Sequence, residues 1–91
     1  MYIDLINNLT AEDRRALALR GVPSTRVSEW KTGLRLPTRP QAIALAEVKG
    51  VDALQLETEL VLIETEKEAE KKPEMAELLT TVRQNYKRLM M

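Results

Sequence analysis

Three isolated glycines and one late proline constrain the fold of this chain most, because they divide it into short apolar segments. Gly21, Gly33 and Gly50 each follow a run with helical periodicity, and Pro73 interrupts a long charged run. Glycine is favoured just past the last turn of a helix, where the backbone becomes left-handed. This punctuation predicts an all-α fold of five to six helices.

The apolar composition favours the same fold class. Hydrophobic residues make up 44% of the 91 residues, but aromatic residues make up only 3%, and Phe is absent. The core must therefore be built from Leu, Ala, Val, Ile and Met, a set in which helix formers dominate. A chain of this length is expected to form one small domain with a single core.

The missing residue types argue against catalysis. The chain has no Cys and no His, so it lacks thiolate nucleophiles, the usual zinc ligands and the commonest general base near neutral pH. Its densest carboxylates are spaced by two residues, which scatters them around a helix; they are Glu64, Glu66, Glu68 and Glu70. We therefore expect no enzyme activity, no metal site, no cofactor and no small-molecule ligand.

The sequence also lacks the marks of a membrane or secreted protein. The first ten residues, MYIDLINNLT, have no basic start followed by a long apolar run. No stretch reaches the roughly eighteen apolar residues that a membrane span needs. The expectation is a cytoplasmic protein without a membrane partner.

Helix boundaries in the first quarter follow from periodicity and capping. Apolar side chains recur at helical spacing at Tyr2, Leu5, Ile6 and Leu9, which predicts a first helix ending near Asn7 or Asn8. Thr10 is predicted to cap a second helix that places Leu17 and Leu19 inside and ends at Gly21.

The third predicted helix is about two turns long and carries the only Trp. Ser24 is expected to be its N-cap and Gly33 its left-handed end. Val27 and Trp30 lie three positions apart, so both should face inward. A lone Trp at such a position indicates a core residue rather than a base-stacking one.

Three further helices are predicted in the rest of the chain. Thr38 or Arg39 precedes a fourth helix, Asp52 opens a fifth, and Pro73 starts a sixth. The sixth carries an apolar stripe that suggests dimerisation, although it could instead complete the core of one chain; the stripe is Met75, Leu78, Leu79, Val82 and Tyr86. Residues 1–51 are thus predicted to form one module and residues 52–91 a helical extension of the same domain.

The net charge of zero conceals a difference between these two parts. Residues 1–51 contain eight basic and five acidic side chains (8 − 5 = +3), and residues 52–91 contain six and nine (6 − 9 = −3). Between Arg14 and Arg39 seven basic residues accompany Glu29 alone. If folding gathers them on one face, they would attract a polyanion, and the acidic helices would face away from it. Charge alone is equally compatible with an ordinary solvated surface.

A family resemblance joins these observations. Residues 14–52, RRALALRGVPSTRVSEWKTGLRLPTRPQAIALAEVKGVD, resemble the Cro and lambda-repressor type of helix-turn-helix domain, also called the XRE family. Gly21 stands at the turn, Val27 and Trp30 at the apolar positions, Gly33 at the helix end, and ALAEVKGVD resembles the closing LAxxLGVD. The resemblance covers under half the chain.

The resemblance implies that the third helix lies in the major groove of double-stranded DNA. The expected base-reading residues are Ser24, Thr25, Arg26, Ser28 and Glu29. The Arg26 guanidinium suits the two acceptors of guanine. The Glu29 carboxylate would accept a hydrogen bond from the amino group of cytosine or orient an arginine. The expected backbone contacts are Lys31, Thr32, Arg35 and Arg39.

The function predicted on this basis is that of a phage or prophage-type transcriptional repressor. It would bind a pseudo-palindromic operator as a homodimer, because one short helix reads only a few base pairs. Two alternatives stay open from the sequence: an antitoxin whose C-terminal helices mask a toxin partner, and a helical protein-interaction adaptor that does not bind DNA.

Overall fold

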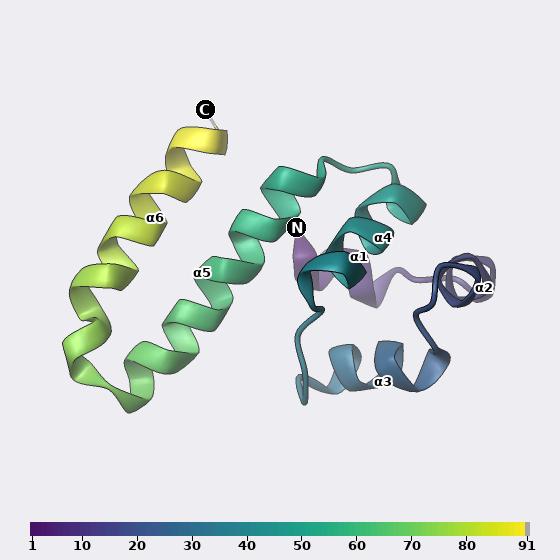
Figure 1. The fold of residues 1–91 in the computed structure, drawn as a ribbon, viewed down its shortest axis with the longest axis horizontal. Coiled ribbons are helices and arrows are strands. Elements are labelled where there is room, and N and C mark those ends of the chain that lie inside the picture. Colours follow the sequence, from purple (N-terminus) through teal and green to yellow (C-terminus); the bar gives the residue numbers. More distant parts are fainter. Residues whose placement is uncertain (91) are drawn as a thin grey trace.

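The computed structural model describes residues 1–90, and within them it contains helices and no strand (Figure 1). The α-helices are α1 (Tyr2–Asn7), α2 (Ala11–Leu19), α3 (Ser24–Thr32), α4 (Arg39–Lys49), α5 (Ala53–Lys71) and α6 (Ala76–Met90). A 3-10 turn, η1 (Pro73–Met75), precedes α6. The prediction of an all-α fold is confirmed.

The starts of α2 and α4 are set by side chains that cap the backbone. The Thr10 hydroxyl accepts a hydrogen bond from the Asp13 N–H, and the Asp13 carboxylate accepts one from the Thr10 N–H, both at 3.0 Å. Thr38 and Gln41 form the same reciprocal pair at the start of α4. Each reciprocal pair, known as a capping box, satisfies two N–H donors that a helix start otherwise leaves unpaired.

The prediction that Ser24 caps α3 is wrong by one residue. Pro23 is the N-cap, in an extended conformation, and its carbonyl accepts from the N–H groups of Arg26 and Val27. Proline suits this place because it has no N–H to satisfy. The Ser24 hydroxyl accepts instead from Arg14 of α2 at 2.9 Å, so it links two helices.

One core lies among α1 to α4 and the first half of α5. Its largest fully buried side chains are Trp30, Tyr2, Leu17, Leu45, Leu56, Val22 and Val27. The expected inward position of Leu19 is wrong, because this side chain is 88% exposed. At 3.6 residues per turn, two positions separated by two lie on nearly opposite sides of a helix, and Leu17 occupies the inner one.

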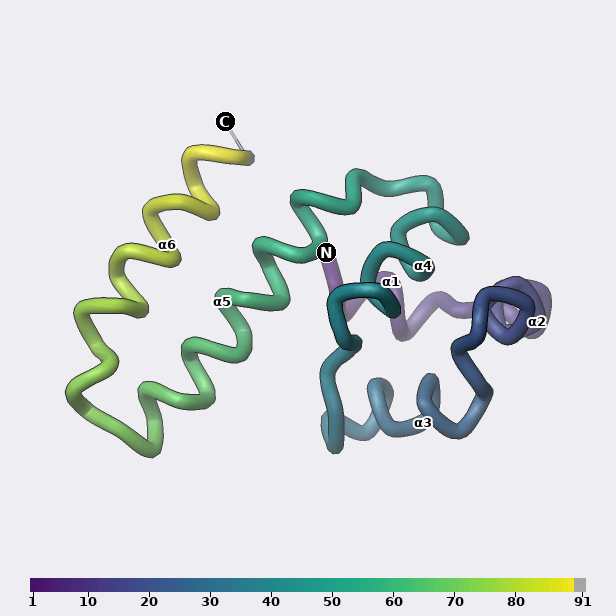
Figure 2. Tube along the Cα trace, in the orientation of Figure 1, coloured from purple at the N-terminus to yellow at the C-terminus, as the bar shows by residue number. Residues whose placement is uncertain are grey.

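The helix α6 lies outside this core and runs side by side with α5, so that the two form a hairpin (Figures 1 and 2). Glu59 of α5 ties the hairpin to the start of the chain, since its Oε1 accepts from the Met1 ammonium and from the Tyr2 N–H, each at 3.1 Å. Tyr86 of α6 lies beside the same carboxylate. Burial and then the Glu59 charge raise the pKa of Tyr86. Glu59 therefore joins α5 to the start of α1, at a place that Tyr86 of α6 also approaches.

Candidate nucleic-acid interface

The α2 and α3 helices are joined by a short turn and cross steeply. Figure 1 shows α2 end-on while α3 is seen from the side. Val22 of the turn is buried, and Val27 and Trp30 of α3 are 0% and 1% exposed. The prediction that both α3 residues face inward is confirmed, and Trp30 is a core residue.

Burial of these two residues turns the opposite face of α3 toward solvent. Ser24, Thr25 and Ser28 are exposed along its first two turns. Hydroxyl groups donate and accept hydrogen bonds, so this face can pair with either kind of polar group on a ligand. Three of the five predicted reading residues thus lie together on one accessible face.

The charged members of α3 form a cluster around Glu29. The Oε1 atom of Glu29 lies 3.1 Å from Nη1 of Arg26, and its Oε2 atom lies 3.0 Å from Nε of Arg35. Arg35 reaches α3 because Gly33 takes a left-handed φ of 78° and the chain turns back. The Glu29 carbonyl accepts from the N–H groups of Leu34 and Arg35. A residue predicted to read bases and one predicted to hold phosphate therefore share one carboxylate.

The last two residues of α3 are open to solvent. Lys31 and Thr32 are both exposed there. The Thr32 hydroxyl donates to the Glu29 carbonyl at 3.1 Å, and in residues 1–90 Lys31 forms no ion pair within 4.0 Å. The lysine ammonium is thus available to an incoming anion.

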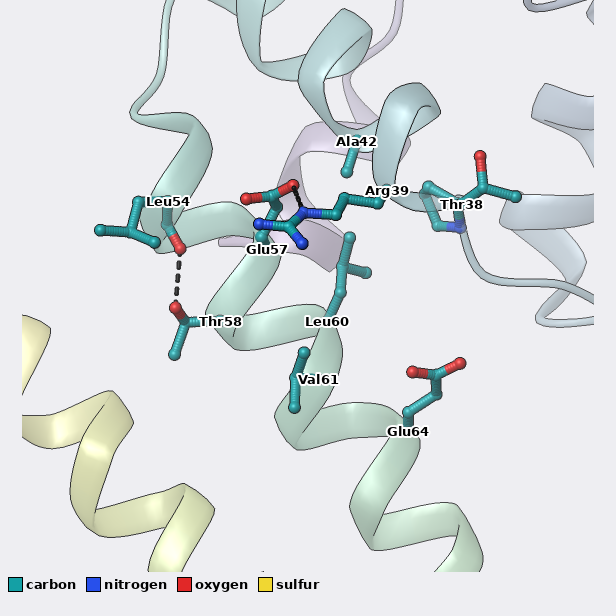
Figure 3. A pocket seen from close by; sticks show the side chains of 10 residues that line it. Thr38, Arg39, Ala42, Leu54, Glu57, Thr58, Leu60, Val61 and Glu64 are labelled. Carbon is teal, nitrogen blue, oxygen red and sulfur yellow. Dashed lines mark hydrogen bonds and ion pairs between the residues drawn. The ribbon is translucent and has the colours of Figure 1, made fainter.

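Arg39 is not gathered with the other predicted backbone contacts. Its Nε lies 3.1 Å from Oε1 of Glu57, so its guanidinium turns toward α5 (Figure 3). The two residues border a groove of about 380 Å³ between α4 and α5, which Leu54 and Val61 also line. Arg39 keeps 83% of its side chain exposed, but it stands over this groove and not beside α3.

Three residues lie near α3 although the sequence did not predict that they would. Arg14 reaches the start of α3 through Ser24. Glu64 and Lys67 of α5 line an opening of about 430 Å³ together with Arg26 and Arg35. The second half of α5 thus lies next to the candidate interface, although its acidic composition led us to expect it elsewhere. No sequence signal could have indicated these contacts, because they depend on how the helices pack.

The predicted dimerisation stripe is divided between two environments. Met75, Leu79, Val82 and Tyr86 are half-buried, and α6 packs along α5 of the same chain. Leu78 is 49% exposed. The stripe therefore has a role within one chain, and Leu78 remains accessible to a second copy.

Other kinds of site are not found in the part of the chain that is described. Residues 1–90 contain no group of three carboxylates placed to hold a metal ion. Among the helices described, none is both long enough and apolar enough to cross a membrane. Comparisons of the chain with protein-family models, with curated proteins and with solved structures find no significant match. The geometry of α2 and α3 is therefore the main guide to function.

Proposed function

We propose that this protein is a sequence-specific double-stranded DNA-binding transcriptional regulator of the helix-turn-helix type. The observation that carries the proposal is the division of α3 into a buried face with Val27 and Trp30 and an open face with three hydroxyl side chains. A short helix with one face packed on the core and a polar face toward solvent fits the major groove, which admits one α-helix.

Some residues around α3 would contact bases and others would contact phosphates. Arg26 has free guanidinium N–H groups besides the one held by Glu29, and arginine suits the two acceptors of guanine. Lys31 and Arg35 follow the reading positions, where positive charge without fixed geometry is enough to bind phosphate. Ser24 would position Arg14 beside the same backbone.

A repressor of the phage type that acts as a homodimer is the most specific form of this proposal. Two turns of helix reach only a few base pairs, whereas a two-fold dimer reads two half-sites about one helical turn apart. The exposed Leu78 on α6 supports a contact between copies. Phage-type repression rests on the family resemblance of residues 14–52.

A gel-shift assay with fragments from the neighbourhood of the gene, including its upstream region, tests the proposal. We expect one fragment to form a complex that survives excess random DNA and weakens as salt is raised. If no fragment and no random DNA binds, DNA binding is contradicted. In that case the antitoxin and adaptor alternatives move ahead, and co-purification with a small toxin would identify the first.

A substitution identifies the reading helix. Arg26→Ala should cost about 1 to 3 kcal/mol on the operator and flatten the preference at one base pair in each half-site. The control is Arg88→Ala, which removes an exposed arginine on α6 and should leave binding unchanged. Equal binding by Arg26→Ala and the unaltered chain would show that α3 does not read the sequence.

A further inference from the structure

Both carboxylate oxygens of Glu29 are already engaged in the free protein. Oε1 pairs with Arg26 and Oε2 with Arg35, at 3.1 and 3.0 Å. The Glu29 side chain is only 25% exposed, while those of Arg26 and Arg35 are 31% and 60% exposed. A cytosine amino group would therefore have to share an oxygen that already faces an arginine, on a side chain that is mostly buried. The geometry therefore argues against Glu29 as a base reader.

We propose that Glu29 is a positioning residue that sets the discrimination between operator and other DNA by holding Arg26 and Arg35 in one cluster. This inference rests on the proposed DNA-binding function. Two arginines and one glutamate carry a net charge of +1 instead of +2. Because binding to random DNA depends on neutralising phosphates, the cluster attracts random DNA less than two free arginines would.

Operator binding should suffer less from the same pairing. Glu29 holds Arg26 by Nη1, which leaves its other N–H groups for two hydrogen bonds to a base. An arginine already restrained in place loses less rotamer freedom when it binds. Glu29 thus weakens the sequence-independent part of binding while it prepares the sequence-dependent part, and the ratio of the two affinities rises.

The test is Glu29→Gln, which keeps the side-chain shape and one acceptor but removes the charge. Dissociation constants for the selected operator and for a random duplex are measured by fluorescence anisotropy over a range of salt. We expect random DNA to bind roughly tenfold tighter per subunit near 0.1 M salt, and the salt slope to steepen by about 0.9, the effect of one more phosphate contact. Operator affinity should change less than random-DNA affinity, so discrimination falls by severalfold.

Two controls separate positioning from simple loss of negative charge. Glu70→Gln removes an exposed carboxylate at the end of α5 that forms no ion pair with any residue from 1 to 90, and it should leave discrimination unchanged. In a chain that already carries Arg26→Ala and Arg35→Ala, Glu29→Gln should have no effect on random DNA. Far-UV circular dichroism should show that every variant is folded.

Three results would overturn the inference. The inference fails if Glu29→Gln leaves both the discrimination between operator and random DNA and the salt slope unchanged. An equal gain of random binding in the chain without the two arginines would show direct repulsion of phosphate by Glu29. A selective loss at one operator base pair, with random binding unchanged, would make Glu29 a base reader. In all three the unaltered protein binds DNA, whereas failure of the proposed function is seen as no DNA binding by that protein.

Discussion

The ammonium of Lys49 lies 3.0 Å from Oδ2 of Asp13 and so joins the end of α4 to the start of α2. The same carboxylate oxygen accepts from the Thr10 N–H at 3.0 Å. The hydrogen bond from Thr10, followed by that from Lys49, holds the pKa of Asp13 below its ordinary value of 3.8. Asp13 therefore stabilises both a helix start and a helix–helix contact.

The depressed pKa makes the contribution of Asp13 dependent on pH. An acid whose pKa is lower in the folded state stabilises the fold above its unfolded pKa, and this contribution is lost as the pH falls through the folded pKa. Asp13→Asn should therefore cost about 1 kcal/mol near pH 7, and the difference should shrink below about pH 4. Urea denaturation near pH 7 and again below about pH 4 measures the difference in free energy of unfolding between the two proteins. A constant difference between the two proteins would contradict the assignment.

Trp30 should be the most sensitive core position. Because its side chain is 1% exposed, Trp30→Ala should lower the free energy of unfolding by roughly 3 to 5 kcal/mol. Far-UV circular dichroism during urea denaturation measures the loss, with Leu34→Ala as a control, since Leu34 is 72% exposed. A stable Trp30→Ala protein that has lost only DNA binding would place Trp30 in the interface.

Glu59 should matter for the attachment of α1. Glu59→Ala removes the acceptor for the Met1 ammonium and the Tyr2 N–H, and unpaired donors cost about 1 to 3 kcal/mol when they are shielded from water. Thermal unfolding should show the loss, and hydrogen exchange should show faster exchange in α1. Glu70→Ala is the control. Equal stability of the two variants would mean that the Glu59 contacts contribute nothing net.

The dimer proposal predicts a particular response to charge on α6. Leu78 and Leu89 are 49% and 42% exposed, so Leu78→Lys with Leu89→Lys should keep the fold but convert a dimer into a monomer. Light scattering at tens of micromolar measures the mass of each protein. Leu19→Lys, at an exposed position on α2, should leave the mass unchanged. A monomeric unaltered chain at this concentration would contradict the homodimer.

Most helix boundaries, although not the start of α3, could be predicted from the sequence because they depend on contacts between near neighbours. Thr10 and Asp13 lie three positions apart, and so do Thr38 and Gln41, and each pair caps its own helix. Gly33 and Gly50 end helices because their left-handed φ angles are favourable for glycine. Val27 and Trp30 could be assigned to the core for a similar reason, since their spacing places them on one face.

The environment of the charged side chains was decided only by the tertiary structure. The sequence identifies Arg35 and Arg39 as basic residues of one loop region, but Arg35 turns back to Glu29 while Arg39 pairs with Glu57, eighteen positions away. Which carboxylate each arginine reaches depends on the direction of the chain after Gly33 and on the packing of α5 against α4. Local periodicity defines which face of a helix is polar, and only the packing of the helices determines what that face meets.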